Sequence, residues 1–582
     1  MPIARLSVVC IALLLFLAAC GRVEAAEASV LEAQAARVKV VQEICPTVVA
    51  IFAPQAKGGG SGVLVSHDGF AVTNFHVVQG LGPFMKCGLN DGKVYDAVLV
   101  SIDPTGDVAL IQLLGRSDFP AAKIGNSDDV RPGDWCWVVG NPFLLATDFQ
   151  PTVTYGVVSG THRYQYPAGT ILEYTDCLQV DASINPGNSG GPLFNSRGEL
   201  IGINGRGSFE KRGRVNVGVG YAISINQVMH FFDHLKSGRI VDHATLGATV
   251  QTDADGNVII ASILEQSEAY RRGLRSGDEL VSFAGRPIRS VNQFKNILGI
   301  YPKGWKLPIS YSRDGQKTDT VVRLRALHRS AELNGSEEKE EPEPNPIPMP
   351  GKPGRKPGDA PANPHGENGE FPEKYKHLFE EKAGFANYYF NRQARDRLLK
   401  SVKSWGDFGP GNAVWTFAGK RDGKEELQLK LTEAAVGIRV GKDALVLSLE
   451  GDPTADPPGS GGLLLALAHL RQLLIDPDHF TECYYLGSEP LDGTGEKVDV
   501  VITTRGSTMS RWYFARPEPR LIGWDTSVEE DLDECEIRIL EMGEVGGRRF
   551  PRKMTVRSGG KPYADLQVEA GDWGAAGPVK AP

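Results

Sequence analysis

The sequence lacks an internal apolar segment of the roughly 20 residues that a membrane-spanning helix needs, so no span is predicted beyond the extreme N-terminus. It also lacks a basic excess, because 63 Lys and Arg stand against 71 Asp and Glu for a net charge of −8. That balance argues against binding to nucleic acid, which needs a basic surface to release counterions. Eight cysteines among 582 residues are too few for a scaffold held together by disulfides.

The composition is typical of a globular chain with several domains. Hydrophobic residues make up 41% and charged residues 23%, an ordinary balance that excludes wholesale disorder. At about 100–200 residues per domain, the length predicts about three to five domains. The 68 glycines and 37 prolines predict many turns and a linker.

The N-terminus predicts an exported protein. Residues 6–19 (LSVVCIALLLFLAA) form one apolar stretch behind Arg5, about the length of a signal-peptide core. Its last residues, LAAC, end at Cys20 and resemble the lipobox of bacterial lipoproteins. That resemblance implies a signal peptide over 1–19 and a lipid on Cys20. A plain secretory signal that is cut near Ala26 is the alternative.

Either signal predicts a location on the periplasmic or cell-envelope face of a membrane. A lipid on Cys20 would anchor the protein to that membrane through a tether over 20–45. Export also permits disulfides, but the sequence assigns no pairs. The cysteines that would remain for pairing are Cys45, Cys87, Cys136, Cys177, Cys483 and Cys535.

Residues 46–240 are predicted to form a mainly β domain. Its short strands are broken by Gly, Pro, Asn and Asp turns without intervening helices, which favours a barrel or sandwich over βαβ units. A helix over 226–237 ends the domain, because apolar residues recur at i, i+3, i+4 and i+7 and Gly238 stands at the C-cap. Strands are expected at 48–53, 61–66, 95–102, 108–113, 135–140 and 153–159.

Two further units and a linker follow. Residues 246–325 are predicted as a smaller α+β unit. Residues 329–372 are almost all Pro, Gly, Glu and Lys, so they are predicted to be a disordered linker, with a proline-rich partner ligand as the alternative. Residues 373–575 are predicted as a C-terminal α+β domain with an antiparallel sheet, an amphipathic helix over 373–404 and a second helix at about 462–475.

Three segments carry residues suited to nucleophilic catalysis. They are TNFHVV with His76, DPTGDVALI with Asp107 and NPGNSGGPL with Ser189. Singly, each has an ordinary structural explanation. Together they are specific, because a serine hydroxyl needs an adjacent base, an imidazole titrates near the working pH, and a buried carboxylate fixes its tautomer.

The glycine-rich loop around the serine also predicts an oxyanion hole, formed by Gly187, Asn188 and Ser189. Glycine lets the backbone turn so that the N–H groups of Gly187 and Ser189 face one point. These groups could hold the negative charge that develops on a carbonyl oxygen under attack.

Residues 46–235 resemble the trypsin-like serine protease domain of the HtrA/DegP family. The resemblance implies a chymotrypsin-like pair of perpendicular six-stranded β-barrels with the site between them. It implies that His76 is the general base, that Asp107 orients it and that Ser189 is the nucleophile, with no metal or cofactor. Besides the three segments, the likeness rests on GGGSG from Gly58, GNPF from Gly140, YGVVS from Tyr155 and GYAI from Gly220.

The same resemblance implies polypeptide substrates, in particular misfolded or damaged envelope proteins, and a homotrimer held mainly by N-terminal aromatic contacts. No aromatic cluster precedes residue 50, so the oligomeric state stays open. The serine loop also fits the G-x-S-x-G elbow of α/β-hydrolases. That elbow needs a helix directly after the serine, whereas a strand is expected at 199–203, and its histidine lies downstream rather than upstream.

The resemblance also predicts the specificity pocket. Trypsin-like enzymes that select Lys or Arg carry a carboxylate about six residues before the serine, where this chain has Ser183. Because no wall residue is acidic, cleavage after small or medium apolar residues is expected. The expected S1 residues are Ser183, Ile203, Asn204, Gly220, Tyr221 and Ala222.

Residues 246–325 resemble the PDZ domain that follows HtrA protease domains, through LGA and the turn GLRSGDEL. The resemblance implies that a C-terminal peptide adds as a strand and that backbone N–H groups hold its carboxylate. The charged run 265–272 departs from the family and leaves the ligand open, and a small domain without a peptide role is the alternative. The expected carboxylate loop is Thr245, Leu246, Gly247 and Ala248.

The C-terminal region carries no catalytic constellation. PGSGG at 458–462 lacks the Gly-Lys-Ser/Thr ending of a phosphate loop, and His469 and His479 have no partner at metal-ligand spacing. The helix-then-meander order, with WYF at 512–514, resembles the curved half-barrels of periplasmic lipoprotein carriers. That resemblance implies an apolar groove for lipid or an unfolded chain.

The sequence therefore predicts an exported serine endopeptidase of HtrA/DegP type that forms an acyl-enzyme on Ser189. The alternative is a catalytically inert scaffold that binds peptides through the PDZ-like and C-terminal domains. All three residues of the triad are present, which favours the enzyme.

Overall fold

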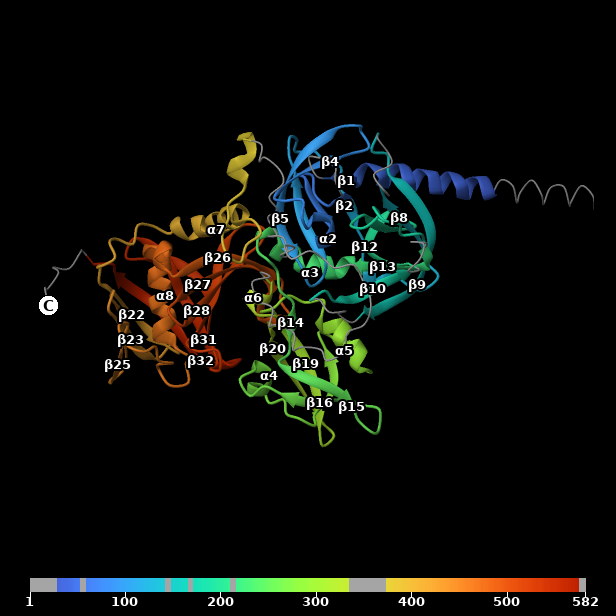
Figure 1. Cartoon of the computed structure of the whole chain (residues 1–582). Helices are drawn as coiled ribbons and strands as arrows, with labels where there is room; N and C mark the ends of the chain where they lie inside the picture. The colour runs from blue at the N-terminus through green and yellow to red at the C-terminus, as the bar shows by residue number, and fades with distance from the viewer. Residues whose placement is uncertain are drawn as a thin grey trace, which may run out of the picture.

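The chain folds into three β-rich lobes, coloured blue to teal, green, and orange to red in Figure 1. The mainly β, multidomain fold class predicted from the sequence is confirmed. The predicted signal peptide, the predicted lipid site at Cys20 and most of the predicted linker lie outside the described residues. The computed structural model describes residues 29–52, 59–141, 148–165, 171–209, 216–333 and 373–574.

The first lobe contains a closed six-stranded barrel of order β1-β2-β3-β6-β5-β4, and the short helix α2 (Phe75–Val78) follows β3. Strands β2, β3 and β6 bury residues on both faces because one face fills the barrel and the other packs on the rest of the domain. The strands are β1 Val48–Phe52, β2 Gly59–Leu64, β3 Phe70–Thr73, β4 Phe84–Gly88, β5 Val94–Asp103 and β6 Val108–Leu113.

A second ring of six strands completes the lobe. Strand β11 pairs with both β8 and β12, which closes the ring, and β7 (Lys123–Ile124) adds in parallel to β12. The predicted pair of six-stranded barrels is thus confirmed. The ring strands are β8 Trp135–Gly140, β9 Thr152–Gln165, β10 Tyr174–Val180, β11 Pro192–Asn195, β12 Glu199–Phe209 and β13 Asn216–Ser224.

Helix α3 (Ile225–Lys236) ends this lobe where the periodicity predicted a helix. Its residues Val228, Phe231 and Leu235 are buried in the core. Gly238 follows with φ +71°, a backbone region that glycine enters without a steric cost. Upstream, a helix over 29–44 occupies part of the predicted tether and projects from the lobe in Figure 1.

The second lobe is built on a six-stranded sheet, in which β15-β16-β17-β19-β20 follow one another and β18 pairs with β17. Strand β15 lies at the edge, and helix α5 (Val291–Leu298) contacts it. Helix α6 (Ser330–Leu333) lies within the first residues of the predicted linker. The other elements are β14 Ala244–Thr245, β15 Ala248–Thr252, β16 Val258–Ile263, α4 Glu268–Arg271, β17 Glu279–Phe283, β18 Arg286–Pro287, β19 Lys306–Arg313, β20 Gln316–Arg323 and β21 Arg325–Ala326.

The third lobe is one eleven-stranded antiparallel sheet of order β25-β24-β23-β22-β32-β31-β30-β29-β28-β27-β26. Helix α8 (Leu463–Ile475) contacts both β24 and β29, which lie far apart in that order, so the sheet curves around the helix (Figure 1). The strands are β22 Trp415–Arg421, β23 Glu425–Leu431, β24 Ala435–Val440, β25 Asp443–Ser448, β26 Glu482–Pro490, β27 Lys497–Arg505, β28 Thr508–Ala515, β29 Arg520–Ser527, β30 Cys535–Val545, β31 Arg548–Ser558 and β32 Lys561–Asp572.

The single helix predicted over 373–404 is wrong. A 3₁₀ helix (Glu373–Leu378) and α7 (Tyr388–Lys403) are separated by an irregular stretch in which Gly384 has φ +81°. Asn387 ends that stretch, because its side chain accepts a hydrogen bond from the N–H of Tyr389 and caps α7.

The stretch before α7 and the first turn of α7 pack on the first lobe. Phe390 and Ala386 belong to the cores of that lobe, and Tyr375 stacks on Phe84 at 6.0 Å between ring centroids. The C-terminal unit is therefore joined to the first lobe by contacts of the residues that directly follow the predicted linker.

Candidate active site

The serine loop begins with a tight turn over Asn185-Pro186-Gly187-Asn188. The N–H of Asn188 donates to the carbonyl oxygen of Asn185 at 2.9 Å, and Gly187 has φ +102°. Proline in the second position and glycine with positive φ in the third define a type II turn. The hydrogen bond that closes this turn uses the N–H of Asn188 and not the N–H of Gly187.

Two backbone N–H groups in this loop stay available to a ligand. Within the described part of the chain, the N–H groups of Gly187 and Ser189 donate to no acceptor. The N–H of Asn188 is engaged in the turn, so of the three predicted oxyanion-hole residues it contributes no free donor. The hydroxyl of Ser61 donates to the carbonyl oxygen of Gly187 at 2.6 Å and holds the turn from the first barrel.

His76 and Asp107 form a paired imidazole and carboxylate. Nδ1 of His76 lies 2.8 Å from Oδ2 and 3.0 Å from Oδ1 of Asp107, and the backbone N–H of His76 donates to Oδ1 at 3.0 Å. The Asp107 side chain is 1% exposed and the His76 side chain 44%. Asp107 has φ +56°, a conformation that aspartate tolerates better than most residues.

The charge of Asp107 tunes the imidazole. Burial lowers the pKa of His76, but the hydrogen bond and the charge of Asp107 outweigh burial, so the pKa of His76 is raised above 6.5. A carboxylate next to an imidazole favours the charged imidazolium. This arrangement suits a base that must hold a proton briefly during a reaction.

The two barrels bring the serine loop against the histidine. The N–H of Ser61 donates to the carbonyl oxygen of Ser189 at 2.9 Å. A side chain at Gly190 would lie 2.3 Å from Oγ1 of Thr73 and 3.0 Å from the N–H nitrogen of Asn74, two residues before His76. Only glycine allows this approach, so the GNSGG motif packs the nucleophile's loop onto the turn that carries His76.

The Ser189 hydroxyl donates to the carbonyl oxygen of Gly205 at 3.2 Å rather than to His76. Catalytic hydrogen bonds are often formed only once a substrate is bound. The structure therefore packs the loop of Ser189 against the turn that carries His76, with the serine hydroxyl directed to Gly205 in β12.

The predicted specificity residues fall into two groups. Ile203, Asn204 and Ala222 have no exposed surface, so they cannot touch a substrate side chain directly. Asn204 instead pins the serine loop, because its Nδ2 donates to the carbonyl oxygen of Pro192 at 2.9 Å and its own carbonyl oxygen accepts from the N–H of Gly190 at 2.8 Å.

The other three expected pocket residues differ in their exposure. Ser183 is exposed, Tyr221 is half-buried and Gly220 is buried. A side chain at Gly220 would lie 2.6 Å from Cδ1 of Ile184 and 3.3 Å from Cγ2 of Val180. Gly220 therefore lies against the core of the second barrel, in which Ile184 and Val180 are buried.

Tyr174 is a further site residue that the sequence did not predict. Its hydroxyl donates to Oδ2 of Asp107 at 2.6 Å, and both side chains are buried. The two residues are 67 positions apart, and a tyrosine at the start of a strand carries no signal of such a contact.

The predicted carboxylate loop of the second lobe is a tight turn. Gly247 has φ +73°, its N–H donates to Oγ1 of Thr245 at 3.2 Å, and Leu246 is buried in the core of the lobe. Ala248 then opens β15, whose outer edge has no paired strand among the described residues. An unpaired edge beside α5 is the geometry that strand addition requires.

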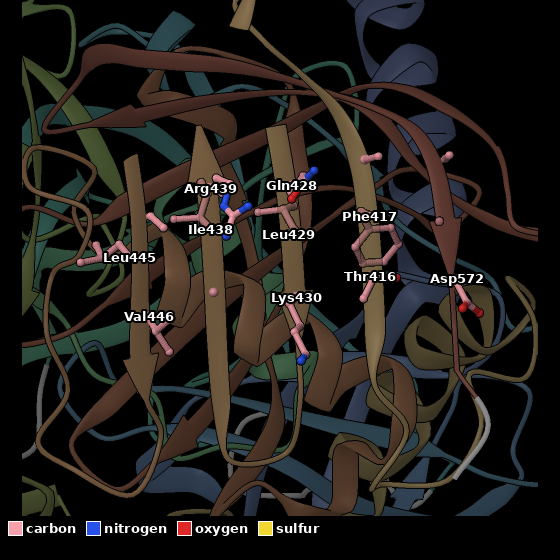
Figure 2. Close-up of a pocket in the computed structure, with 15 residues that line it drawn as sticks. Thr416, Phe417, Gln428, Leu429, Lys430, Ile438, Arg439, Leu445, Val446 and Asp572 are labelled. Atoms are coloured by element: carbon pink, nitrogen blue, oxygen red, sulfur yellow. The ribbon is translucent and has the colours of Figure 1, made fainter. Parts of the chain in front are cut away.

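In the third lobe, α8 fills the hollow of the curved sheet, so the predicted apolar groove is occupied by the chain itself. A separate cavity of about 600 Å³ lies over five neighbouring strands (Figure 2). Successive residues of a strand point to opposite faces of the sheet, and in these strands exposed and buried side chains alternate. Lys430 is exposed and its neighbour Leu429 is buried, and Thr416 is exposed and its neighbour Phe417 is buried. The cavity therefore opens on the face turned away from α8.

The six cysteines at 45, 87, 136, 177, 483 and 535 are unpaired in the described structure. One group of carboxylates, Asp525, Glu534 and Glu536, lies close enough to hold a cation. The ammonium group of Lys306 already lies among them, 2.6 Å from Glu536 and 3.4 Å from Asp525. Within the described residues, no helix is both long and apolar enough to cross a bilayer.

Comparison with known proteins agrees with this geometry. Residues 60–203 match the family model of the trypsin-like peptidase domain, so the first lobe is a trypsin-like peptidase domain. The chain is 37% identical over 278 residues to a probable periplasmic serine endoprotease DegP-like of Marinomonas sp., covering 46% of this chain and 57% of that protein. It is 36% identical over 278 residues to the periplasmic serine endoprotease DegP of Escherichia coli, covering 46% and 56%.

A solved structure titled HtrA-type protease AlgW with tripeptide is 30% identical, covering 50% of this chain and 98% of that chain with a TM-score of 0.42. Of the two curated relatives named above, the matched part of the chain spans a little over half the length. The resemblance to HtrA/DegP proteases predicted from the motifs is confirmed in the similarity of these sequences.

Proposed function

We propose that this protein is an exported serine endopeptidase of HtrA/DegP type. The observation that carries the proposal is the buried Asp107 carboxylate bound to His76, on a turn against which the loop of Ser189 packs. In that loop, two backbone N–H groups have no acceptor among the described residues. A carboxylate, an imidazole and a hydroxyl in this relation support acyl transfer. The carboxylate orients the imidazole, and the imidazole takes the proton of the hydroxyl, which then attacks the substrate.

In this mechanism, Ser189 attacks the substrate carbonyl while His76 takes its proton. Asp107 holds the imidazole in the correct tautomer and stabilises the imidazolium. The N–H groups of Gly187 and Ser189 stabilise the oxyanion. His76 then gives the proton to the leaving amine, and water hydrolyses the acyl-enzyme by the same route in reverse.

Substrate and location are parts of the same proposal. The relatives are named periplasmic serine endoproteases, which supports an exported protein that cuts polypeptides. Misfolded or damaged envelope proteins are the substrates that the family resemblance implies. The absence of an acidic residue at Ser183 and along the expected pocket walls supports cleavage after small or medium apolar residues. A peptide library whose cleavage is dominated by Lys or Arg would contradict this preference.

Anchoring, peptide capture and assembly complete the proposal. A lipid on Cys20 would hold the protein at the membrane, and a Cys20→Ala variant should then leave the membrane fraction. The unpaired edge of β15 beside α5 would take up a C-terminal peptide. The family resemblance implies a homotrimer. Light scattering tests this, because a trimer should have three times the mass of one chain in solution.

The test of the activity is labelling with a serine-directed fluorophosphonate. The wild type should be labelled, and Ser189→Ala should lose both the label and at least roughly 10⁴-fold in turnover of an unfolded protein substrate. Ser196→Ala, at an exposed serine of the following turn, is the matched control and should keep both. Equal labelling of Ser189→Ala and the wild type would end the proposal.

One observation favours the alternative of an inert peptide-binding scaffold. The hydroxyl of Ser189 is bonded to Gly205 and not to His76. A scaffold would bind peptides at β15 and resist the fluorophosphonate even in the presence of those peptides. The labelling experiment, repeated with a C-terminal peptide added, separates the two functions.

A further inference from the structure

The strongest unassigned feature beside the triad is the hydrogen bond between Tyr174 and Asp107. The tyrosine hydroxyl donates to Oδ2 at 2.6 Å, and Tyr174 is 4% and Asp107 1% exposed. Tyr174 opens β10 in the second barrel, whereas Asp107 lies between β5 and β6 in the first. The bond therefore crosses from one barrel to the other and ends on the carboxylate that holds His76.

This bond completes the set of donors around the carboxylate. Oδ1 receives the backbone N–H of His76, and Nδ1 of His76 faces both oxygens. Nδ2 of Asn74 donates to the carbonyl oxygen of Asp107 at 2.9 Å and holds its backbone. A carboxylate gripped on both oxygens cannot rotate without losing a buried hydrogen bond, and such a loss is costly.

Gly205 leaves the space that the tyrosine ring occupies. A Cβ at position 205 would lie 2.7 Å from Cε1 and 3.1 Å from the hydroxyl oxygen of Tyr174, closer than packed atoms approach. The carbonyl oxygen of Gly205 also accepts the hydroxyl of Ser189. The ring of Tyr174 thus lies against the strand that faces the nucleophile.

We propose that Tyr174 is a positioning residue of the active site, whose hydroxyl sets the plane of the Asp107 carboxylate and through it the ring of His76. This inference rests on the proposed peptidase function. A hydrogen bond to an ionised carboxylate is stronger than one between neutral groups, so its loss should weaken the hold on the Asp107 carboxylate. Without the hydroxyl, more negative charge faces His76, which stabilises the imidazolium and makes the basic form rarer at neutral pH.

The test uses the full chain and a fluorophosphonate ester, with the maximal labelling rate (kinact) and the binding term (KI) measured across the neutral pH range. Tyr174→Phe should lower kinact roughly 10- to 100-fold, leave KI unchanged and move the acid limb of the pH profile to higher pH. Tyr485→Phe is the matched control, because it removes a buried bond of the same kind, 2.8 Å from Tyr485 to Asp499, far from the triad.

A second pair of variants separates positioning from folding. Tyr174→Ala removes the ring, and Tyr174→Ala with Gly205→Ser supplies a new hydroxyl close to the position of the lost one. The double variant should recover kinact relative to Tyr174→Ala. No recovery would overturn the inference.

The remaining outcomes are distinct. A wild type that is not labelled overturns the proposed function and this inference with it. A labelled wild type with an unchanged kinact and acid limb in Tyr174→Phe overturns this inference alone. Equal losses in Tyr174→Phe and Tyr485→Phe, with the acid limb unmoved, also overturn it, because they indicate a merely structural bond.

Discussion

Asn391 and Tyr485 exchange two hydrogen bonds across the boundary between α7 and β26. Nδ2 of Asn391 donates to the carbonyl oxygen of Tyr485 at 2.8 Å, and the N–H of Tyr485 donates to Oδ1 at 3.1 Å. Nδ2 also donates to the carbonyl oxygen of Ser237, directly after α3, at 2.8 Å. One fully buried side chain therefore joins the protease lobe to the C-terminal sheet.

Replacement of Asn391 by Ala should loosen this junction. The change leaves buried backbone groups of Ser237 and Tyr485 without partners, and each such group costs about 1–3 kcal/mol. We expect the free energy of unfolding in urea to fall by at least about 2 kcal/mol. Asn412→Ala, at an exposed asparagine, is the control. The same urea midpoint in both variants would contradict the claim that Asn391 stabilises the contact between the two lobes.

A Gly187→Ala substitution should damage the oxyanion hole without unfolding the protein. Alanine does not tolerate φ +102°, so the turn must change and carry the N–H of Gly187 away from the cleft. The loss of one oxyanion donor typically lowers kcat on the order of 10²–10³-fold. Gly133→Ala, with φ +98° and open space around it, is the matched control. Both variants should melt alike and only the first should lose activity.

The acid limb of the activity profile should report His76. The base must be neutral to accept a proton, and the Asp107 carboxylate raises the pKa of His76 above 6.5. Activity should therefore fall as the pH drops through a value above 6.5. Asp107→Asn should move this limb to lower pH and reduce turnover on the order of 10⁴-fold, because the carboxylate no longer holds the imidazole. A limb that stays in place in Asp107→Asn would assign it to another group.

The second and third lobes are held together by buried charges around Asp525. Its carboxylate lies 2.9 Å from Arg323, 3.4 Å from Lys306 and 2.7 Å from Arg538. Asp525→Asn leaves these cations partly unpaired and should lower the free energy of unfolding by about 3–5 kcal/mol. Asp531→Asn, at an exposed carboxylate, is the control and should have no comparable effect.

The same cluster has a pH signature. Burial raises the pKa of Asp525, but the charges of Arg538, Lys306 and Arg323 lower it well below its usual range. Its stabilising contribution is therefore present above the unfolded pKa of about 3.9 and is lost as the pH falls through the lower folded value. The wild type and Asp525→Asn should converge in stability only in strong acid. A difference that vanishes near neutral pH would contradict this linkage.

The protease lobe was accessible to sequence reasoning because its signals are local. The alternation of apolar residues, the glycine turns and the motif around Ser189 each depend on residues a few positions apart. The type II turn at Pro186-Gly187 follows directly from the residue types. Helix α3 was found for the same reason, because its apolar periodicity is a property of the segment itself.

The helix predicted over 373–404 failed because tertiary contacts outweigh local periodicity there. The apolar side chains of Tyr375, Ala386 and Phe390 pack into the cores of the protease lobe. They do not form one face of a single helix. The specificity residues were mixed with supporting ones for a related reason: a motif does not reveal that Asn204 faces inward and holds the serine loop.

The order of residues along the chain alone determined the mainly β lobes, the serine loop and the three candidate catalytic residues, because turns and periodicity are short-range properties. Only the folded chain decided that Tyr174 meets Asp107, that α8 fills the curved sheet and that Asn391 joins two lobes. These contacts link residues far apart in sequence. They depend on how complete surfaces fit together, and no local pattern encodes that fit.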